Sequence, residues 1–439
     1  MRLLIRNCKL YVNDRIVENC FLLIETPLIA DFGIDHGGHS SYDINLNARG
    51  RILLPGMIDA HVHLRDQLLS YKEDFKTGTA SAVLGGVTSV IDMPNNDPPT
   101  NTPTNLLERM ELAKSKILAN VGFTCKPSVN HSINLELSKI GAIAFKVFLY
   151  EYMVDGFLDT SSLVKILSSL SKLDRVLMLH CNIKSKFSEV LKLARRRSMF
   201  KLCRIEKELA ESILRIAQAY KARLHFCHVS CPKAIEAINK RKGFMEVSLE
   251  VTIHHLLLNY STLELLGSIA HVDPPLKSKS TATSLFKLLK SGAVDIVVTD
   301  HAPHAIFEKE GDDPKPGFPN LQLMMPTLMT QVKKGRLSLN TVVEKTTIKP
   351  AEIFRIKKRG MIRKGYYADL VEVDFKRKLK VKSQILVSKG KYTPFEGAIL
   401  VGIPVRTYVN GICVNDDYTI VGRGGEGKVI IPGDEPHEC

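Results

Sequence analysis

Two histidines separated by a single residue, His61 and His63, close an apolar stretch early in the chain. Side chains at positions i and i+2 of a β-strand point to the same face, so both imidazoles can reach one metal ion. Val62 then packs on the opposite face, and Arg65 continues the phase just beyond the strand, where a cation can meet an anionic substrate. Such a pair also occurs in buried strands for packing alone. Because further His, Lys, Asp and Glu residues end later apolar runs, we predict a metal site.

A single lysine, Lys146, lies inside the apolar run from 142 to 149. A buried, unpaired ammonium group is costly, so this side chain must be paired, deprotonated or chemically modified. A desolvated amine can react with CO2 to give a carbamate, whose two oxygens can bridge two cations. The alternative is a lysine whose ammonium group reaches solvent along its aliphatic stem. The nearby pair of histidines favours the metal bridge.

Three later residues also end apolar runs and complete a set of candidate ligands: His180, His228 and Asp300. Four histidines, one lysine and one aspartate match a two-metal hydrolytic site, in which the carboxylate can also take a proton from water.

Cys227 points away from its neighbour His228 on a regular strand, and we expect it in the core. Glu250 lies in an apolar setting and needs a partner, either as a metal ligand or as an acceptor for a ligand histidine.

Two further polar residues lie where they could hold an anionic substrate. Asn95 follows the apolar run that ends at Met93, and its amide could hydrogen-bond a carboxylate. An Asx-type turn before Asp97 is the alternative interpretation. His304 lies a few residues beyond Asp300, where it can face a bound anion.

Apolar strands alternate with amphipathic helical stretches about eight times from residue 52 onward, which is typical of a (β/α)8 TIM barrel in the α/β class. The predicted barrel strands cover residues 57–63, 87–93, 119–125, 141–149, 175–181, 223–229, 245–251 and 294–300. Such barrels keep their chemistry at the C-terminal strand ends, where every candidate ligand falls. The termini instead contain short strands with Gly and Pro between them. We therefore predict a small all-β domain of residues 1–51 and 361–439 beside a barrel domain of residues 52–360.

Composition limits the function classes. The 439 residues are 44% hydrophobic and 24% charged, as in ordinary globular proteins. No apolar run is long enough for a membrane span, and the first residues are too quickly polar for a signal peptide, so we expect a cytoplasmic protein. The net charge of +15 is dispersed, and its densest clusters, 195–197 and 376–378, are not interleaved with aromatics. This pattern disfavours nucleic-acid binding.

The chain resembles the dihydroorotases of the amidohydrolase superfamily, in the class that includes the animal dihydroorotase domain. The motifs that carry the resemblance are His61-Val62-His63-Leu64-Arg65-Asp66, Lys72-Glu73-Asp74-Phe75, Met93-Pro94-Asn95, Phe145-Lys146, His228-Val229-Ser230, Asp300-His301-Ala302-Pro303-His304 and Pro316-Gly317-Phe318-Pro319. The related hydantoinases and allantoinases lack the arginine of the first motif. Most dihydroorotases have Pro-Gly after Arg-Asp, whereas this chain has Gln67-Leu68. The Tyr150–Met153 loop also departs from the animal pattern, and Asp273 stands where many bacterial dihydroorotases have asparagine.

The resemblance implies two Zn²⁺ ions with six ligands: His61, His63, His180, His228, Asp300 and a bridging carboxylated Lys146. Asp300 would also move the proton in catalysis. Four positions would contact the substrate: Arg65, Asn95, His304 and the backbone at Gly317. Cys227 and Glu250 match positions near the metals, which implies an additional metal contact there.

The implied reaction is the reversible interconversion of N-carbamoyl-L-aspartate and (S)-dihydroorotate in de novo pyrimidine (UMP) biosynthesis. One alternative is a cyclic amidase of the hydantoinase or allantoinase type, against which Arg65 argues because neutral hydantoins offer no carboxylate. The other is an inactive scaffold partner of aspartate carbamoyltransferase, against which the complete set of six ligands argues. The sequence leaves open a homodimer and an association of the active enzyme with aspartate carbamoyltransferase.

Overall fold

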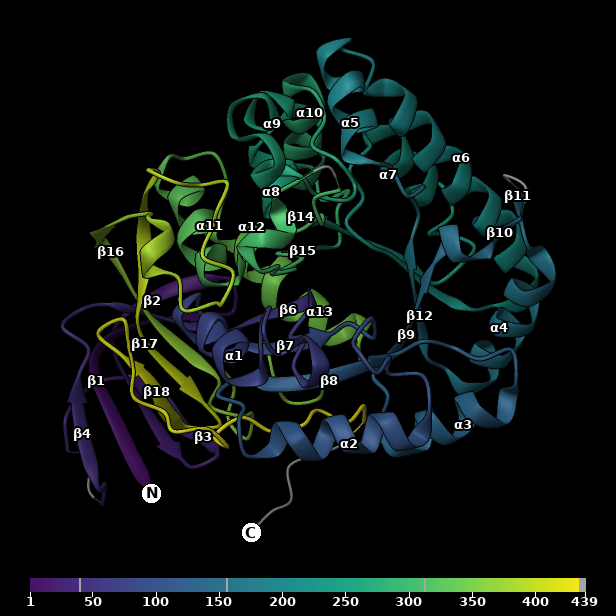
Figure 1. Ribbon diagram of the computed structural model, residues 1–439. Coiled ribbons are helices and arrows are strands. Elements are labelled where there is room, and N and C mark those ends of the chain that lie inside the picture. Colours follow the sequence, from purple (N-terminus) through teal and green to yellow (C-terminus); the bar gives the residue numbers. More distant parts are fainter. Residues whose placement is uncertain (39–40, 155–156, 312, 434–439) are drawn as a thin grey trace.

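The computed structural model describes residues 1–38, 41–154, 157–311 and 313–433 (Figure 1). An eight-stranded parallel sheet curls into a nearly closed barrel in the order β15-β14-β13-β12-β9-β8-β7-β6. A parallel bridge between Val62 and His301 lies at the seam between the first and last strands. The barrel strands are β6 (Met57–Val62), β7 (Val87–Asp92), β8 (Asn120–Cys125), β9 (Ala144–Phe148), β12 (Val176–His180), β13 (Arg223–Phe226), β14 (Val247–Thr252) and β15 (Ile296–Val298). The predicted TIM barrel is thereby confirmed.

Helices surround the barrel, as Figure 1 shows. The α-helices are α1 (Phe75–Leu84), α2 (Pro103–Lys114), α3 (His131–Ile140), α4 (Thr160–Leu173), α5 (Phe187–Arg195), α6 (Phe200–Ala217), α7 (Pro232–Asn239), α8 (Ile253–Leu257), α9 (Tyr260–Leu266), α10 (Lys279–Lys290), α11 (Met324–Lys333), α12 (Leu339–Val343) and α13 (Lys349–Ile353). The short 3₁₀ turns are η1 (Gln67–Leu69), η2 (Leu149–Tyr152), η3 (Gln218–Tyr220), η4 (Gly267–Ala270), η5 (Ile306–Lys309), η6 (Leu321–Leu323) and η8 (Ser383–Ile385), and η7 (Glu344–Ile348) is a π-helical turn.

The helices α1 and α2 each begin at a residue whose side chain caps the helix N-terminus. At α1 the Asp74 side chain accepts a hydrogen bond from the Thr77 N–H, and the Thr77 side chain bonds back to the Asp74 backbone. At α2 the Thr102 hydroxyl accepts from the Asn105 N–H, and Pro103 occupies the first helical turn, where no backbone donor is missed. These caps satisfy donors that the helix itself leaves unpaired, and so they define where each helix starts.

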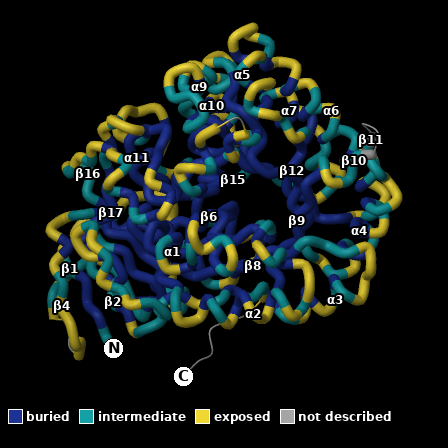
Figure 2. Tube along the Cα trace, viewed as in Figure 1, coloured by how far each residue is buried: buried dark blue, intermediate teal, exposed yellow. Residues whose placement is uncertain are grey.

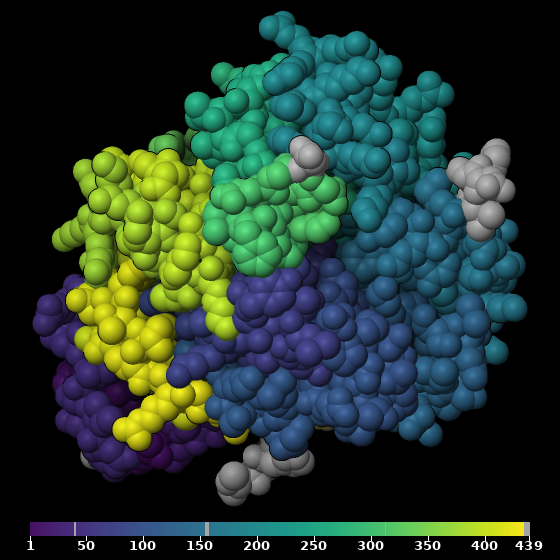
Figure 3. Space-filling view, in the orientation of Figure 1, coloured from purple at the N-terminus to yellow at the C-terminus, as the bar shows by residue number. Residues whose placement is uncertain are grey.

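Strands from both termini form a second, nine-stranded sheet in the order β19-β18-β17-β16-β5-β1-β2-β3, with β4 also paired to β1. Its strands are β1 (Arg2–Val12), β2 (Arg15–Glu25), β3 (Leu28–Ile34), β4 (Ile44–Asn47), β5 (Ile52–Pro55), β16 (Leu370–Lys380), β17 (Ile399–Val409), β18 (Ile412–Asp416) and β19 (Thr419–Ile420). Purple and yellow segments accordingly lie side by side in Figure 3. β5 joins this sheet although the predicted barrel domain starts at residue 52, and the division into domains remains a prediction. A small β10–β11 hairpin (Met153–Val154, Phe157–Leu158) stands apart.

The barrel strands are buried on both faces, whereas exposed residues gather on the outer helices and loops (Figure 2). Parallel strands covered by helices have apolar residues in almost every position, which explains why their sequence pattern is so continuous. A buried polar residue in such a strand is therefore conspicuous. In the part of the chain that the structure describes, no helix has the length and apolar character needed to cross a membrane.

Candidate active site

Nine residues predicted to form a site meet around one cavity of about 220 Å³ at the C-terminal ends of the barrel strands. They are His61, His63, Arg65, Asn95, His180, His228, Asp300, His304 and Gly317. Lys146, Cys227 and Glu250 lie buried next to them. We call His61, His63, Lys146, His180, His228 and Asp300 the histidine half of the site, and Arg65, Asn95, His304 and Gly317 the loop half.

In the histidine half, β6 and the end of β15 bring three potential ligands together. Asp300 Oδ1 lies 3.6 Å from His61 Nε2 and 3.4 Å from His63 Nε2. One ligand atom from each of the three residues lies within 4.8 Å of the other two, a spacing that could hold a metal ion. Burial lowers the pKa of both imidazoles and raises the pKa of Asp300. The histidines are therefore neutral, which is the form that binds a metal.

The opposite side of the histidine half contains buried polar atoms without partners. His180 Nδ1 lies 2.9 Å from His228 Nε2. His228 Nδ1 and Lys146 Nζ have no hydrogen-bond partner among the described residues, and Lys146 is 1% exposed. His180 Nε2 has no hydrogen bond either, although Asp273 Oδ2 lies 3.5 Å away. Buried polar atoms are rarely left unpaired, so these orphans fit a group that binds between them. Lys146 does not reach solvent, which disfavours the alternative of an exposed ammonium group.

The Glu250 carboxylate on β14 is hydrogen-bonded to two histidine rings and to one backbone N–H. Its partners are Nδ1 of His61, Nε2 of His225 at 2.9 Å, and the His228 N–H at 2.9 Å. Burial raises its pKa, but the adjacent His61 and His225 outweigh burial and leave that pKa below its usual value. With Nδ1 of His61 bonded to the carboxylate, Nε2 remains directed at the cavity. This geometry supports the prediction of Glu250 as an acceptor for a ligand histidine.

Cys227 lies in the core, as expected, and is also close to potential metal ligands. It packs in an apolar cluster, and burial raises the pKa of its thiol. Its Sγ, one His61 nitrogen and one Glu250 oxygen lie within 4.8 Å of one another. The strand is not regular here, because β13 ends at Phe226 and His228 has a φ of 35°. The sequence argument that alternation separates Cys227 from His228 therefore does not apply.

In the loop half, Arg65 is the buried cation that faces the cavity. Its side chain is 5% exposed, and its Nε has no hydrogen-bond partner among the residues that the structure describes. Burial lowers the pKa of this guanidinium. Asn95 uses its Oδ1 to accept a hydrogen bond from His63 Nδ1 at 2.6 Å. The amide thus orients a histidine as well as facing the cavity.

The segment from His304 to Gly317 forms the rest of the loop half. His304 Nε2 lies 3.1 Å from the Pro316 carbonyl oxygen, and burial lowers the pKa of His304 to about 3. Gly317 has a φ of 148°, and a Cβ there would lie 2.2 Å from the Ala302 carbonyl oxygen, so only glycine fits. Lys309 Nζ and the Tyr392 hydroxyl both donate to the Gly317 carbonyl oxygen, at 3.2 and 3.1 Å. In Figure 3 this green segment lies against the blue-purple segment near residue 70.

Sequence reasoning missed several residues that line the cavity, notably Phe148, Tyr150 and Asp273. Asp273 Oδ2 lies 3.5 Å from His180 Nε2, and the Tyr150 ring meets the His180 ring edge-on. Tyr150 and Asp273 stand at positions where the sequence departs from related proteins, which was the available signal. Their loops follow strands far apart in the chain, so no local pattern places them beside His180.

Comparison with known proteins decides the family. The family model described as "Amidohydrolase family" matches residues 52–414, most of the chain. The chain belongs to the amidohydrolase family. Members of this family are typically metal-dependent, in agreement with the two ligand groups in this amidohydrolase that could hold a metal ion.

The relatives of this amidohydrolase include many proteins named dihydroorotase, which confirms the predicted resemblance. The dihydroorotase of Methanosphaera stadtmanae is 31% identical over 94% of this chain and 96% of its own, and that of Methanothermobacter thermautotrophicus is 32% identical over 95% and 97%. The multifunctional protein CAD of Squalus acanthias is 32% identical over 88% of this chain, but the match covers 16% of that protein.

Solved structures with the same fold include the L-hydantoinase (dihydropyrimidinase) from Arthrobacter aurescens, with a TM-score of 0.90 and 26% identity over 98% of this chain and 99% of that one. The dihydropyrimidinase from Brevibacillus agri has a TM-score of 0.86 and 25% identity, and the alignment covers 99% and 100% of the two chains. These structures share the barrel with its additional sheet. The choice between substrates therefore depends on the residues in the cavity.

Proposed function

We propose that this protein is a dihydroorotase, which interconverts N-carbamoyl-L-aspartate and (S)-dihydroorotate in de novo pyrimidine biosynthesis. The observation that carries the proposal is the buried Arg65, whose Nε has no hydrogen-bond partner among the described residues and which shares one cavity with the four histidines and Asp300 of the histidine half. Both compounds offer a carboxylate that can pair with the guanidinium. The ring amide bond of dihydroorotate is broken in hydrolysis and formed in cyclisation. The many relatives named dihydroorotase support the same reaction.

Two Zn²⁺ ions fit the histidine half. We propose His61 and His63 as ligands of one ion, His180 and His228 as ligands of the other, and Asp300 and a carboxylated Lys146 as the groups that complete the site. The unpaired atoms of Lys146, His180 and His228 support this assignment, because each is buried and needs a partner. Bound zinc would supply Lewis-acid chemistry, polarising the amide carbonyl and making water a better nucleophile. Cys227 remains a proposed additional metal contact with Glu250.

Asp300 is placed to move the proton. In the hydrolytic direction, its carboxylate takes a proton from the attacking water and delivers it to the ring nitrogen as the amide bond breaks. Burial raises the pKa of Asp300, so the protonated form is easier to reach during turnover than for an exposed carboxyl group. Cyclisation uses the same steps in reverse, with Asp300 returning the proton to the departing water.

The loop half binds the substrate. Arg65 would form the charge-assisted contact with the carboxylate, and Asn95 would donate a hydrogen bond from its amide nitrogen. His304 would donate from Nε2, exchanging its contact with the Pro316 carbonyl for one with the substrate. The Gly317 backbone, held through its carbonyl by Lys309 and Tyr392, would contact the ring. These contacts fix the ring amide relative to Asp300, which lowers the entropic cost of reaching the reactive geometry.

Turnover of dihydroorotate beside hydantoin and allantoin, together with elemental analysis, tests the proposal. We expect turnover of dihydroorotate at a rate far above the other two, and about two zinc ions per chain. Preferred turnover of hydantoin would instead establish the amidase alternative. The solved L-hydantoinase has the same fold as this chain, so the fold does not decide between them. Folded protein without zinc, never exposed to chelator, and without activity would instead support a scaffold role.

Assembly is a separate part of the proposal. The match with a short portion of the multifunctional protein CAD supports an association between this chain and other enzymes. We propose aspartate carbamoyltransferase as the partner, and a homodimer as the form of the free enzyme. Light scattering of the purified protein, alone and mixed with aspartate carbamoyltransferase, measures both: a monomer that never co-elutes with the second enzyme would exclude them.

A further inference from the structure

The turn that carries Arg65 has an unusual backbone. Arg65, Asp66 and Gln67 all have left-handed φ angles, of 55°, 62° and 51°. A residue other than glycine is strained at such an angle, and its surroundings must hold it there. Proline, which most dihydroorotases have at the position of Gln67, could not adopt a φ of 51° because its ring fixes φ near about −65°. This chain must therefore hold the turn by contacts of its own.

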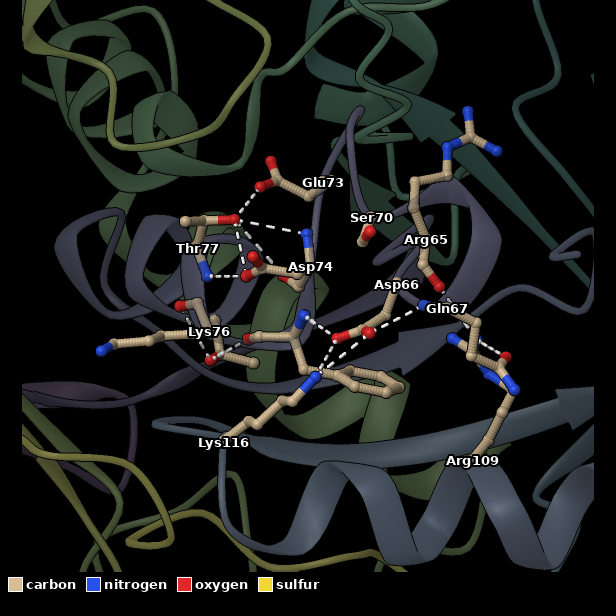
Figure 4. A network of polar contacts seen from close by, with 12 residues as sticks. Arg65, Asp66, Gln67, Ser70, Glu73, Asp74, Lys76, Thr77, Arg109 and Lys116 are labelled. Atoms are coloured by element: carbon tan, nitrogen blue, oxygen red, sulfur yellow. Dashed lines mark hydrogen bonds and ion pairs between the residues drawn. The ribbon is translucent and has the colours of Figure 1, made fainter.

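Arg109 on α2 supplies the central contact (Figure 4). It is 0% exposed, and Nη1 donates to the Arg65 carbonyl oxygen and to Gln67 Oε1, each at 2.9 Å. Nη2 donates to Asp92 Oδ2 at 2.6 Å, and Asp92 Oδ1 accepts from the Leu64 N–H at 2.8 Å. One ion pair thus holds the backbone on both sides of Arg65.

The neighbouring Asp66 anchors the turn from its other side. Its carboxylate accepts hydrogen bonds from the Gln67 N–H at 2.7 Å, from the Phe75 N–H at 3.0 Å and from Lys116 Nζ at 3.1 Å. The Arg109 guanidinium also lies over the Phe75 ring, 4.8 Å from its centroid. The turn is therefore tied to α1 and α2 at once.

These contacts hold the backbone of Arg65 and leave its side chain free. In Figure 4 the Arg65 guanidinium points away from the network, and no dashed line reaches it. Arg109 and Asp92 do not line the cavity. Both act on the site only through the position of the turn, because neither is near enough to touch a substrate there.

We infer that Arg109, Gln67 and Asp92 together fix the direction of the Arg65 guanidinium and thereby determine the affinity for an anionic substrate. We call these three residues the positioning set. The inference rests on the proposed function, in which Arg65 binds the substrate carboxylate. The Gln67 side chain fastens the third left-handed residue to the same guanidinium that holds the first. The set governs KM and leaves the metal site and the chemical step untouched.

Gln67→Ala is the direct test, because alanine meets the same left-handed backbone cost but cannot accept from Arg109. We expect KM for dihydroorotate to rise about 3–10-fold, with kcat and zinc content within about twofold of the parent.

Three further variants frame this result. Gln67→Glu keeps an acceptor oxygen and should restore KM to within about twofold of the parental value. Leu68→Ala is the matched control, since that neighbouring side chain is 70% exposed, and it should leave KM unchanged. Arg109→Met should raise KM further, but it also leaves Asp92 buried without its cation, so the result for Gln67→Ala decides the inference.

A double-mutant cycle separates positioning from a general structural effect. In an Arg65→Met background, Gln67→Ala should have no further effect on KM, because the group that it positions is gone. The same fold-increase in both backgrounds, or an unchanged KM in Gln67→Ala alone, would overturn the inference. A parent enzyme that does not turn over dihydroorotate would instead defeat the proposed function. In that case crystal structures of the parent and Gln67→Ala still decide the inference: a displaced Arg65 side chain supports it, and an unmoved one overturns it.

Discussion

The histidine half and the loop half of the cavity are held in place by different means. His61 and His180 lie on barrel strands and Lys146 lies within one, where the sheet hydrogen bonds fix their direction, and the other three ligands follow a strand end by one or two residues. Arg65 and His304 lie farther beyond the strand ends, in segments that other parts of the chain must hold. The first arrangement comes with the barrel itself, whereas the second depends on remote polar contacts such as those of Arg109 and Lys309.

This difference separates two functions. A metal site needs ligand atoms within a few tenths of an ångström of their positions, and a rigid strand end provides that precision. A substrate site must distinguish one cyclic amide from another, and loops can change for this purpose without disturbing the barrel. The comparison predicts that changes in the histidine half abolish chemistry, whereas changes in the loop half act mainly on KM.

Replacing Lys146 should have the largest effect. Lys146→Ala removes the amine that would become the bridging carbamate, so we expect activity to be abolished and zinc content to fall, measured by turnover and elemental analysis. Short carboxylic acids added in solution should restore part of the activity by occupying the vacated space. Lys146→Arg should not recover function, since a guanidinium keeps its charge and cannot form this carbamate.

A crystal structure of zinc-loaded, active enzyme checks the same point directly. Extra density on Nζ of Lys146 is the expected result. A bare amine there, or a Lys146→Ala variant with full zinc and only a raised KM, would place this residue with the loop half and break the comparison.

The two halves also differ in how far the sequence could predict them. The barrel strands, and with them His61, His180 and Asp300, follow from apolar runs that end in polar residues. The contact between Glu250 and His61 joins residues 189 positions apart, and alternation indicates only that Glu250 needs some partner. Asp273 and Tyr150 were missed because loop paths depend on tertiary contacts that no local pattern encodes. The left-handed turn at Gln67 was visible only as a departure from the usual Pro-Gly.

Removing the cation of the loop half should have the next largest effect. Arg65→Met should raise KM for dihydroorotate strongly, because losing a buried charge-assisted contact costs about 2–5 kcal/mol in transition-state binding. Zinc content should stay at the parental level. Arg204→Met, which breaks an exposed ion pair with Glu208 on α6, is the control and should leave KM unchanged. Parental KM in Arg65→Met would refute the carboxylate contact, and lost zinc would show that the halves are not separable.

Asn95 contacts both halves, so its variants should divide the two effects. Asn95→Ala loses the acceptor for His63 and the amide that faces the cavity, and we expect zinc affinity and kcat/KM to fall by about 10–100-fold. Asn95→Asp keeps an oxygen for His63 but places a negative charge near the substrate carboxylate. It should therefore retain zinc while KM stays high, as zinc titration and steady-state kinetics would show. Loss of zinc in Asn95→Asp would contradict the orienting role.

The smallest effect is expected at His304. Burial lowers its pKa to about 3, so the ring is neutral at both pH 6 and pH 8 in the free protein, and it offers a hydrogen bond but no charge. His304→Ala should raise KM about 2–10-fold, the cost of one neutral hydrogen bond. Because the protonation state does not change between these pH values, the ratio of variant to parental KM should be the same at both.

His36→Ala, at an exposed histidine outside the cavity, is the control and should leave KM at the parental value. A ratio several-fold larger at pH 6 than at pH 8 would mean that His304 binds the substrate as an imidazolium cation, and the loop half would then contain two positive charges.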